Sequence, residues 1–157
     1  MNTSFLFVNE SNEVVMKRTV LREHVFRILF RYDFHEKNDF DEQKRLYFDE
    51  YPDLSDYPEI KDCPILTELD RAEIESRIND VIAHIDEIDE KIKNGCTGWD
   101  INRIGKTELA IIRLACYECY FDPEVDKAIA FNEAVELAKK YAEDKAPAFV
   151  NGVLSKL

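Results

Sequence analysis

Basic and aromatic side chains carry the clearest chemical signal in this chain. Lys17, Arg18 and Arg22 stand together near its start, and Arg18 and Arg22, four residues apart, share a face on a helix. Phe149 follows Pro147, a residue suited to a helix's first turn, where backbone N–H groups favour phosphate. Single-stranded RNA is held by such groups, because phosphates bind Arg and Lys while unpaired bases stack on aromatic rings.

Both features also have a plainer structural explanation. A cluster of charges is often only the solvated face of a helix. Phe149 can equally be a buried residue that anchors the last helix, and its residue type alone favours that explanation. Gly152 raises the same question, since glycine weakens a helix by about 1 kcal/mol relative to alanine. Its place in the apolar string after Phe149 therefore indicates either close packing or a functional surface.

Residues for catalysis or metal binding are poorly arranged. None of the histidines has the spacing of a helix-borne metal site: His24, His35 and His84. Among the four cysteines, Cys116 and Cys119 form a Cys-x-x-Cys pair, but no strand precedes it as a redox motif requires. No nucleophile is flanked by a base, and no glycine-rich phosphate loop occurs. We therefore predict no enzyme activity, no metal and no cofactor.

Charge is distributed unevenly along the 157 residues, whose formal net charge is −12. This total argues against general nucleic-acid binding, which needs many Lys and Arg contacts to phosphate. Residues 16–35, however, hold five bases and two acids, whereas residues 36–62 hold four bases and ten acids. Such asymmetry suits a small, local phosphate site. Without a secretory signal or an apolar run of membrane length, we expect a cytoplasmic protein with reduced thiols.

The hydrophobic pattern is helical almost throughout and predicts an all-α fold. We expect helices over residues 19–34, 41–49, 67–93, 106–121 and 131–141, and a last one after Pro147. The 67–93 helix has an isoleucine-rich stripe and ends at Asn94-Gly95, and Thr67 with Asp70 resembles a capping box. In the 131–141 helix, Phe131 opens the expected apolar stripe with Val135 and Ala138. The first helix has a core stripe and a second, aromatic stripe at steps of four: Phe26, Phe30 and Phe34.

Three strings in order resemble the NusB family of bacterial transcription antitermination factors. The first two are Phe-Asn-Glu-Ala-Val-Glu-Leu-Ala-Lys from Phe131 and Phe-Val-Asn-Gly-Val-Leu from Phe149. Upstream, residues 109–118 are similar to the family's Leu-Arg-x-Ala-x-Tyr-Glu helix, and residues 22–30 more weakly to its first helix. The resemblance is strong from about residue 99 to residue 157, moderate over residues 17–34 and faint between them.

This resemblance implies a fold, a function and a set of partners. The fold is a helical bundle of two three-helix subdomains, with six to seven helices, here residues 16–95 and 96–157. Residues 1–15 would be a poorly ordered N-terminal extension. The family binds the boxA element of nascent ribosomal RNA together with the ribosomal protein NusE, and promotes read-through by RNA polymerase with other Nus factors. No membrane is involved.

Site residues carry over from the family's motifs. RNA contacts map onto Lys17, Arg18, Arg22 and Phe149. We expect folding to bring the basic start of the first helix beside Phe149, in one groove for unpaired nucleotides. The partner-facing surface maps onto Phe30 and Glu108. This chain has fewer bases than is common in the family, with Thr19 at one such place and Ala148 before Phe149. We therefore expect weak RNA binding by the chain alone and tighter binding with NusE.

Two alternatives follow from the same observations. The low basic content and the −12 charge are also compatible with a protein adaptor that has this fold and reads little or no RNA. The two apolar faces of the first helix would also suit a homodimer, in which one of them is covered. A NusB-like domain of an RNA methyltransferase is disfavoured, because no cofactor-binding Rossmann unit occurs in the sequence.

Overall fold

The chain forms two compact units in a computed structural model that describes residues 6–8, 14–16, 18–50, 66–96 and 100–157. The units are Met1–Ile78 and Asn79–Leu157. The division therefore falls earlier than the one predicted after residue 95. It lies inside a helix rather than at the Asn-Gly pair that suggested a boundary.

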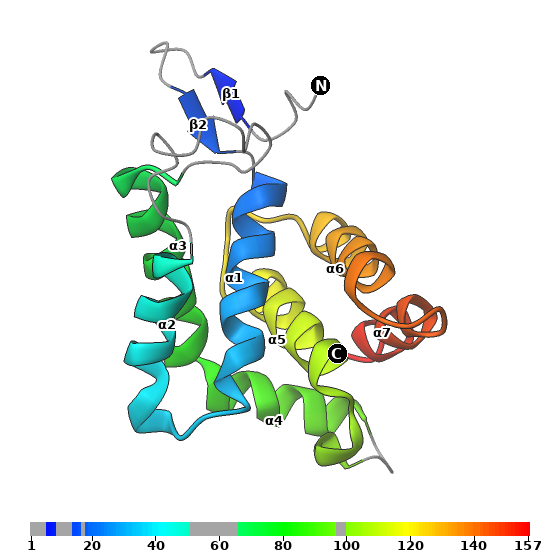
Figure 1. Ribbon diagram of the computed structural model, residues 1–157. Helices are drawn as coiled ribbons and strands as arrows, with labels where there is room; N and C mark the ends of the chain where they lie inside the picture. The colour runs from blue at the N-terminus through cyan, green and yellow to red at the C-terminus, as the bar shows by residue number, and fades with distance from the viewer. Residues whose placement is uncertain (1–5, 9–13, 17, 51–65, 97–99) are drawn as a thin grey trace. The chain divides into compact units, whose positions relative to one another are not determined.

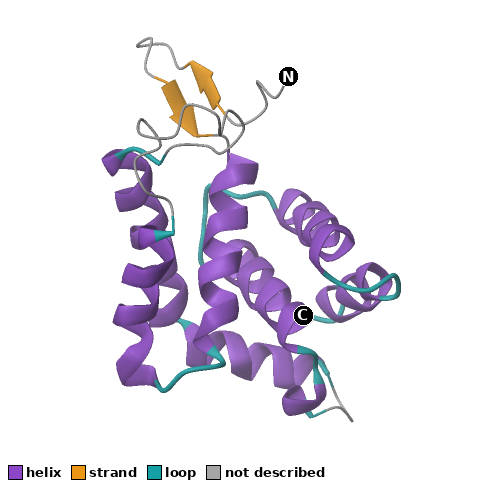
Figure 2. Cartoon of the chain, in the orientation of Figure 1, coloured by secondary structure: helices purple, strands orange, loops and turns teal. Residues whose placement is uncertain are grey.

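Helices dominate the described residues and confirm the all-α prediction (Figure 2). The seven α-helices are α1 Arg18–Tyr32, α2 Phe40–Asp49, α3 Glu68–Ala83, α4 Ile85–Gly95, α5 Lys106–Tyr120, α6 Lys127–Tyr141 and α7 Ala146–Leu154. Two short 3₁₀ turns are η1 Lys37–Asp39 and η3 Ile101–Arg103. No helix in the described ranges is long and apolar enough to cross a membrane.

A short hairpin lies in the segment that we expected to be poorly ordered. Strands β1 Leu6–Val8 and β2 Val14–Met16 pair antiparallel, with Phe7 opposite Val15. Both strings are rich in residues that favour strands. A two-stranded hairpin is only marginally stable in water by itself, so the helices provide the framework of the fold.

The first unit is organised by α1, which packs against α2. Of the core stripe predicted for α1, Tyr32 is only half-buried, and the other four residues are buried: Leu21, Val25, Ile28 and Leu29. From α2, Tyr47 is also buried, and its hydroxyl lies 2.6 Å from Nδ1 of buried His24. The predicted capping box at the start of α3 is present. Thr67 N donates to Asp70 Oδ2 at 3.0 Å, and Asp70 N donates to Thr67 Oγ1 at 3.1 Å.

One helix predicted over residues 67–93 is two helices, α3 and α4, which meet at His84. The apolar stripe runs across the break without interruption: Ile74, Ile78, Val81, Ile85, Ile88 and Ile92 are all buried. At His84 the backbone departs from helical angles (φ −103°, ψ 7°), and the ring Nδ1 lies 2.8 Å from the carbonyl oxygen of Asp80. The histidine ring thus contacts a carbonyl of the last turn of α3, and α4 begins anew.

The second unit is built around α5, which packs against α4, α6 and α7 (Figure 1). Every residue of α5 from Leu109 to Glu118 is buried, which is typical of a central helix rather than of a helix that buries one face. Of the stripe predicted for α6, Ala138 is buried as expected, whereas the rest of the helix's buried face lies one residue earlier than predicted. Its buried residues are Ala130, Ala134, Leu137 and Ala138, whereas Phe131 and Val135 are half-buried. The small alanines allow α6 to approach its neighbours closely.

Candidate nucleic-acid interface

The predicted basic residues lie at the N-terminal end of α1. Arg18 is the first residue of the helix and is exposed. Arg22, one turn further on, is buried, with only 9% of its surface accessible. Both arginines are engaged with other groups in the structure. Lys17 lies outside the described residues. Of Arg18 and Arg22, Arg18 is therefore the one whose side chain can readily meet a phosphate from solvent.

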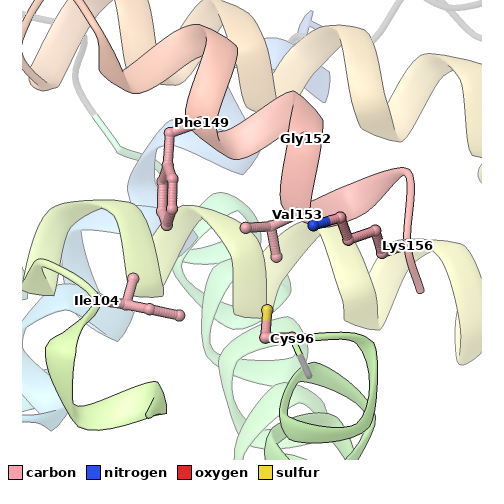
Figure 3. Close-up of a pocket in the computed structure, with 6 residues that line it drawn as sticks. All are labelled: Cys96, Ile104, Phe149, Gly152, Val153 and Lys156. Carbon is pink, nitrogen blue, oxygen red and sulfur yellow. The ribbon is translucent and has the colours of Figure 1, made fainter. Parts of the chain in front are cut away.

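Phe149 lies in the first half of α7, where Pro147 occupies the first turn as predicted. Its ring is half-buried and forms one wall of a pocket in the second unit. The other lining residues are Cys96, Ile104, Gly152, Val153 and Lys156. In Figure 3 the ring projects from α7 toward Ile104, while the Cys96 sulfur points toward Val153. Phe149 is therefore neither fully buried nor isolated on the surface, and it contributes an aromatic face to a recess.

Gly152 is not required for close packing. A Cβ added at this position would meet no atom within 4 Å outside the helix backbone and its chain neighbours. The residue lines the pocket, one turn after Phe149 on the same helix. Of the two explanations for a glycine here, close packing is thus excluded. The absence of a side chain keeps the space beside Phe149 open.

Two lysines near Phe149 were not identified from the sequence. Lys145 is exposed at the N-cap of α7, four residues before Phe149. Lys156 is exposed beyond the end of α7, and its ammonium group points back toward Val153 and the pocket (Figure 3). These cations stand at the two ends of the helix that presents Phe149.

Lys156 is positioned by contacts of its neighbours. Its own N–H donates to the carbonyl of Val153 at 3.0 Å. The carbonyl oxygen of Leu157 accepts a hydrogen bond from the Tyr120 hydroxyl at 2.7 Å. Gly95 lies so close to this segment that an added Cβ would stand 2.7 Å from Leu157 Cδ2. The chain after α7 is therefore tied to α4 and α5, and the Lys156 ammonium is held near the pocket.

Phe30 belongs to an aromatic stripe that runs from the interior to the surface. Its ring centroid is 6.5 Å from that of Phe26 and 4.9 Å from that of Phe34. Phe26 is 3% exposed, Phe30 is half-buried and Phe34 is 54% exposed. This stripe could pack in the core of the protein or face a partner, and only its first member, Phe26, is packed in the core. The exposed end is suited to contact with another protein.

Glu108 has a local structural role at the start of α5. It is half-buried in the first turn of the helix, and Gly105 is the N-cap. Its carboxylate packs so closely against Gly105 that a Cβ there would collide with Glu108 Oε2. A carboxylate at this place stabilises the positive end of the helix dipole. Any contact of Glu108 with a partner would therefore add to this role.

The predicted site residues fall into two groups. Arg18, Arg22 and Phe30 lie on α1 in the first unit, whereas Phe149 and Glu108 lie in the second. Arg18 and Phe30 are twelve positions apart on α1, which corresponds to about 18 Å along the helix axis, so the basic end and the aromatic end are well separated. The meeting of Arg18 with Phe149 in one groove stays a prediction. No cluster of metal-binding side chains occurs in the part of the chain that the structure describes.

Comparisons with known proteins agree on one family. The family model described as the NusB family matches residues 19–157. The transcription antitermination protein NusB of Agathobacter rectalis is 43% identical over 141 residues, which cover 90% of this chain and 98% of that protein. The NusB protein of Lachnoclostridium phytofermentans is 41% identical over 142 residues, with the same coverage.

Solved structures that are similar to this fold include members of the same family. Thermotoga maritima NusB is similar with a TM-score of 0.72 and 25% identity, over 90% of this chain and 89% of that one. A crystal structure of the antitermination factors NusB and NusE in complex with double-stranded RNA contains a chain with a TM-score of 0.68 and 30% identity. That similarity covers 88% of this chain and 92% of that one.

Proposed function

Since this chain belongs to the NusB family, we propose that it is a transcription antitermination factor that binds boxA-type single-stranded RNA together with NusE. It acts on nascent ribosomal RNA and promotes its synthesis, with other Nus factors and RNA polymerase as indirect partners. One observation carries the proposal: the family match extends over residues 19–157, and a relative of the same length class is 43% identical. The activity is one of binding in the cytoplasm, with no catalytic step.

RNA contacts in this proposal come from both units. Lys17 and Arg18 neutralise phosphates, and Phe149 stacks on an unpaired base. The half-buried ring of Phe149 supports this role, because stacking needs one free face and a fixed orientation. Arg22 is buried and has little accessible surface left for a phosphate.

NusE binds the aromatic end of α1. The exposure of Phe34 and the half-burial of Phe30 support this assignment, because interfaces are enriched in aromatic side chains that a partner can cover. RNA and NusE would then occupy opposite ends of one helix. RNA and NusE could therefore each bind without displacing the other. The charges of both would then be present in one complex.

An adaptor that reads little RNA is the second candidate. The burial of Arg22 favours it, because it removes one cation from an already small set in a chain of net charge −12. The two candidates predict different effects of the basic residues. An adaptor would assemble with NusE on RNA equally well after loss of Arg18, whereas an RNA-binding factor would not.

Titration of labelled boxA RNA with the chain alone and with NusE tests the proposal. We expect weak binding by the chain alone, tighter binding with NusE, and a loss of about tenfold in Arg18→Glu and Phe149→Ala. Lys37→Glu, an exposed lysine with the same change of charge, and Phe131→Ala, a half-buried phenylalanine of α6, are the matched controls. Losses no larger than in the controls would favour the adaptor. Equal affinity with and without NusE would contradict the expected gain in RNA affinity from the partner.

A further inference from the structure

Two lysine side chains meet at one exposed tyrosine ring in the second unit. The ammonium group of Lys91, on α4, lies 4.5 Å from the centroid of the Tyr120 ring, and that of Lys127, which begins α6, lies 4.9 Å from it. Tyr120 is the last residue of α5 and is 38% exposed, and both lysines are exposed as well. Three helices therefore bring two cations to one aromatic side chain at the surface. We call these three residues the Tyr120 cluster.

The Tyr120 hydroxyl and the neighbouring rings hold this arrangement in place. The hydroxyl accepts a hydrogen bond from Lys127 Nζ at 3.2 Å and donates one to the carbonyl oxygen of Leu157 at 2.7 Å. Lys127 Nζ also lies 5.7 Å from the centroid of the Phe131 ring, one turn along α6. These contacts keep the lysine tips close to the protein, so part of their conformational freedom is lost before any ligand binds. The Tyr120 cluster is therefore preorganised for a ligand.

The Tyr120 cluster carries two positive charges. In the ranges that the structure describes, neither Lys91 nor Lys127 forms an ion pair. Lys139 of α6, by comparison, lies 3.0 Å from a carboxylate oxygen of Glu136. The two ammonium groups beside one ring repel each other, and an anion next to them would offset this repulsion. Because the edge of an aromatic ring is also positive, an anion can approach Tyr120 at its edge. The cluster is therefore suited to bind an anionic group.

The surroundings of the Tyr120 cluster are acidic, which distinguishes between kinds of anion. Residues 122–126, just before Lys127, hold three acids and no base, and α4 holds four acids and two lysines. An RNA strand carries a phosphate at every nucleotide, so these acids would repel the phosphates on either side of a bound one. The Tyr120 ring is also already in contact with cations, rather than free for a base to stack on it. A single carboxylate in a neutral or basic protein segment avoids both problems.

We propose that the Tyr120 cluster is a docking point for a protein partner, which places one Asp or Glu side chain against Lys91 and Lys127 from a segment that is otherwise neutral or basic. Basic neighbours of that carboxylate face the acids of residues 122–126 and of α4, so complementary charges on both sides fix the orientation of the segment. The docking point shares no residue with the pocket beside Phe149. It adds a protein contact on the second unit to the binding functions proposed above.

Two peptides that differ in one charged group test the docking point. The probes are Gly-Lys-Gly-Glu-Gly-Lys-Gly with blocked ends and its counterpart with Gln in place of Glu, titrated into the full chain at low salt and followed by NMR. We expect the Glu peptide to bind about fivefold more tightly, near the upper limit for exposed ion pairs, with the largest shifts at Lys91, Tyr120 and Lys127. The Gln peptide is the more cationic probe, so general attraction to a chain of net charge −12 would give the opposite order.

Removal of charge from the chain identifies the lysines involved. In the double variant Lys91→Gln with Lys127→Gln, the preference for the Glu peptide should disappear. The control, Lys93→Gln with Lys139→Gln, removes two exposed lysines from the same two helices and should keep the preference. Equal binding of both peptides by the wild-type chain, or an equal preference in both double variants, overturns the proposal. Tighter binding of hexauridylate than of the Glu peptide, lost only without Lys91 and Lys127, assigns the cluster to RNA and overturns it as well.

Discussion

Arg113 and Asp89 form a two-pronged ion pair between α5 and α4. Nε of Arg113 donates to Oδ1 of Asp89 at 2.8 Å, and a terminal guanidinium nitrogen donates to Oδ2 at 2.9 Å. Arg113 lies in the middle of the buried face of the central helix, with only 6% of its surface accessible. The carboxylate thus lies against a cation that is largely removed from solvent, and it offsets part of the free-energy cost of burying that charge.

Loss of Asp89 should destabilise the second unit. We expect Asp89→Ala to lower the free energy of unfolding by about 3 kcal/mol, because it removes the carboxylate that accepts two hydrogen bonds from a buried guanidinium group. Urea denaturation followed by circular dichroism measures the change. Glu90→Ala, at an exposed position of the same helix, should cost less than about 0.5 kcal/mol. A similar cost for the two variants would show that the ion pair contributes no more than a surface carboxylate.

His24 should make stability depend on pH in mildly acid solution. Burial and, to a smaller extent, the nearby charge of Arg27 lower the pKa of His24 to about 4, although the charges of Glu23 and Asp70 oppose this shift. The unfolded chain, with a histidine pKa of about 6.5, therefore binds more protons than the folded chain between these values. Stability is fully present above about pH 6.5 and falls as the pH drops toward 4, by up to about 3 kcal/mol.

Urea denaturation at pH 7 and pH 4.5 measures this loss. In His24→Gln the part of the pH dependence that comes from this residue disappears, although the variant is less stable at pH 7 because Tyr47 loses its partner. His35→Gln, at an exposed histidine, serves as the control and keeps the wild-type dependence. An unchanged dependence in His24→Gln would assign the acid sensitivity to other groups.

Local patterns in the sequence predicted most of the helices, because spacing and caps are local properties. The capping box at Thr67 and Asp70 and the proline at the start of α7 were both confirmed. The break at His84 was not predictable in this way. The isoleucine stripe keeps its period across both helices, and the ring that contacts the Asp80 carbonyl is positioned by tertiary packing on Phe121, with ring centroids 4.4 Å apart.

The candidate site was only partly predictable for a related reason. Phe149 and Gly152 stand in one string, so the sequence indicated both. Cys96, Ile104 and Lys156 come from three other segments and meet only in the folded unit. The full burial of α5 was likewise missed, since its sequence alone does not show that helices pack around it on several sides.

Two glycines should respond in opposite ways to substitution by alanine. Gly152→Ala should raise the free energy of unfolding by about 1 kcal/mol, because alanine favours the helix and its methyl group meets no atom within 4 Å. Gly95→Ala should lower it, because a Cβ there would stand 2.7 Å from Leu157 Cδ2 and 3.2 Å from the carbonyl oxygen of Lys156. Thermal and urea denaturation of the two variants give the comparison. Stabilisation by both substitutions would contradict the close approach at Gly95.

The aromatic stripe of α1 should separate stability from partner binding. Phe26→Ala should lower the free energy of unfolding by about 3–5 kcal/mol, since its ring is buried. Phe34→Ala, at the exposed end, should change stability by less than about 0.5 kcal/mol but weaken binding to NusE about tenfold, as expected for an aromatic interface residue. Phe30→Ala, with a half-buried ring, should affect both. Isothermal titration calorimetry with NusE and urea denaturation give the two quantities for each variant. Wild-type affinity in both Phe30→Ala and Phe34→Ala would place the NusE interface elsewhere on the chain.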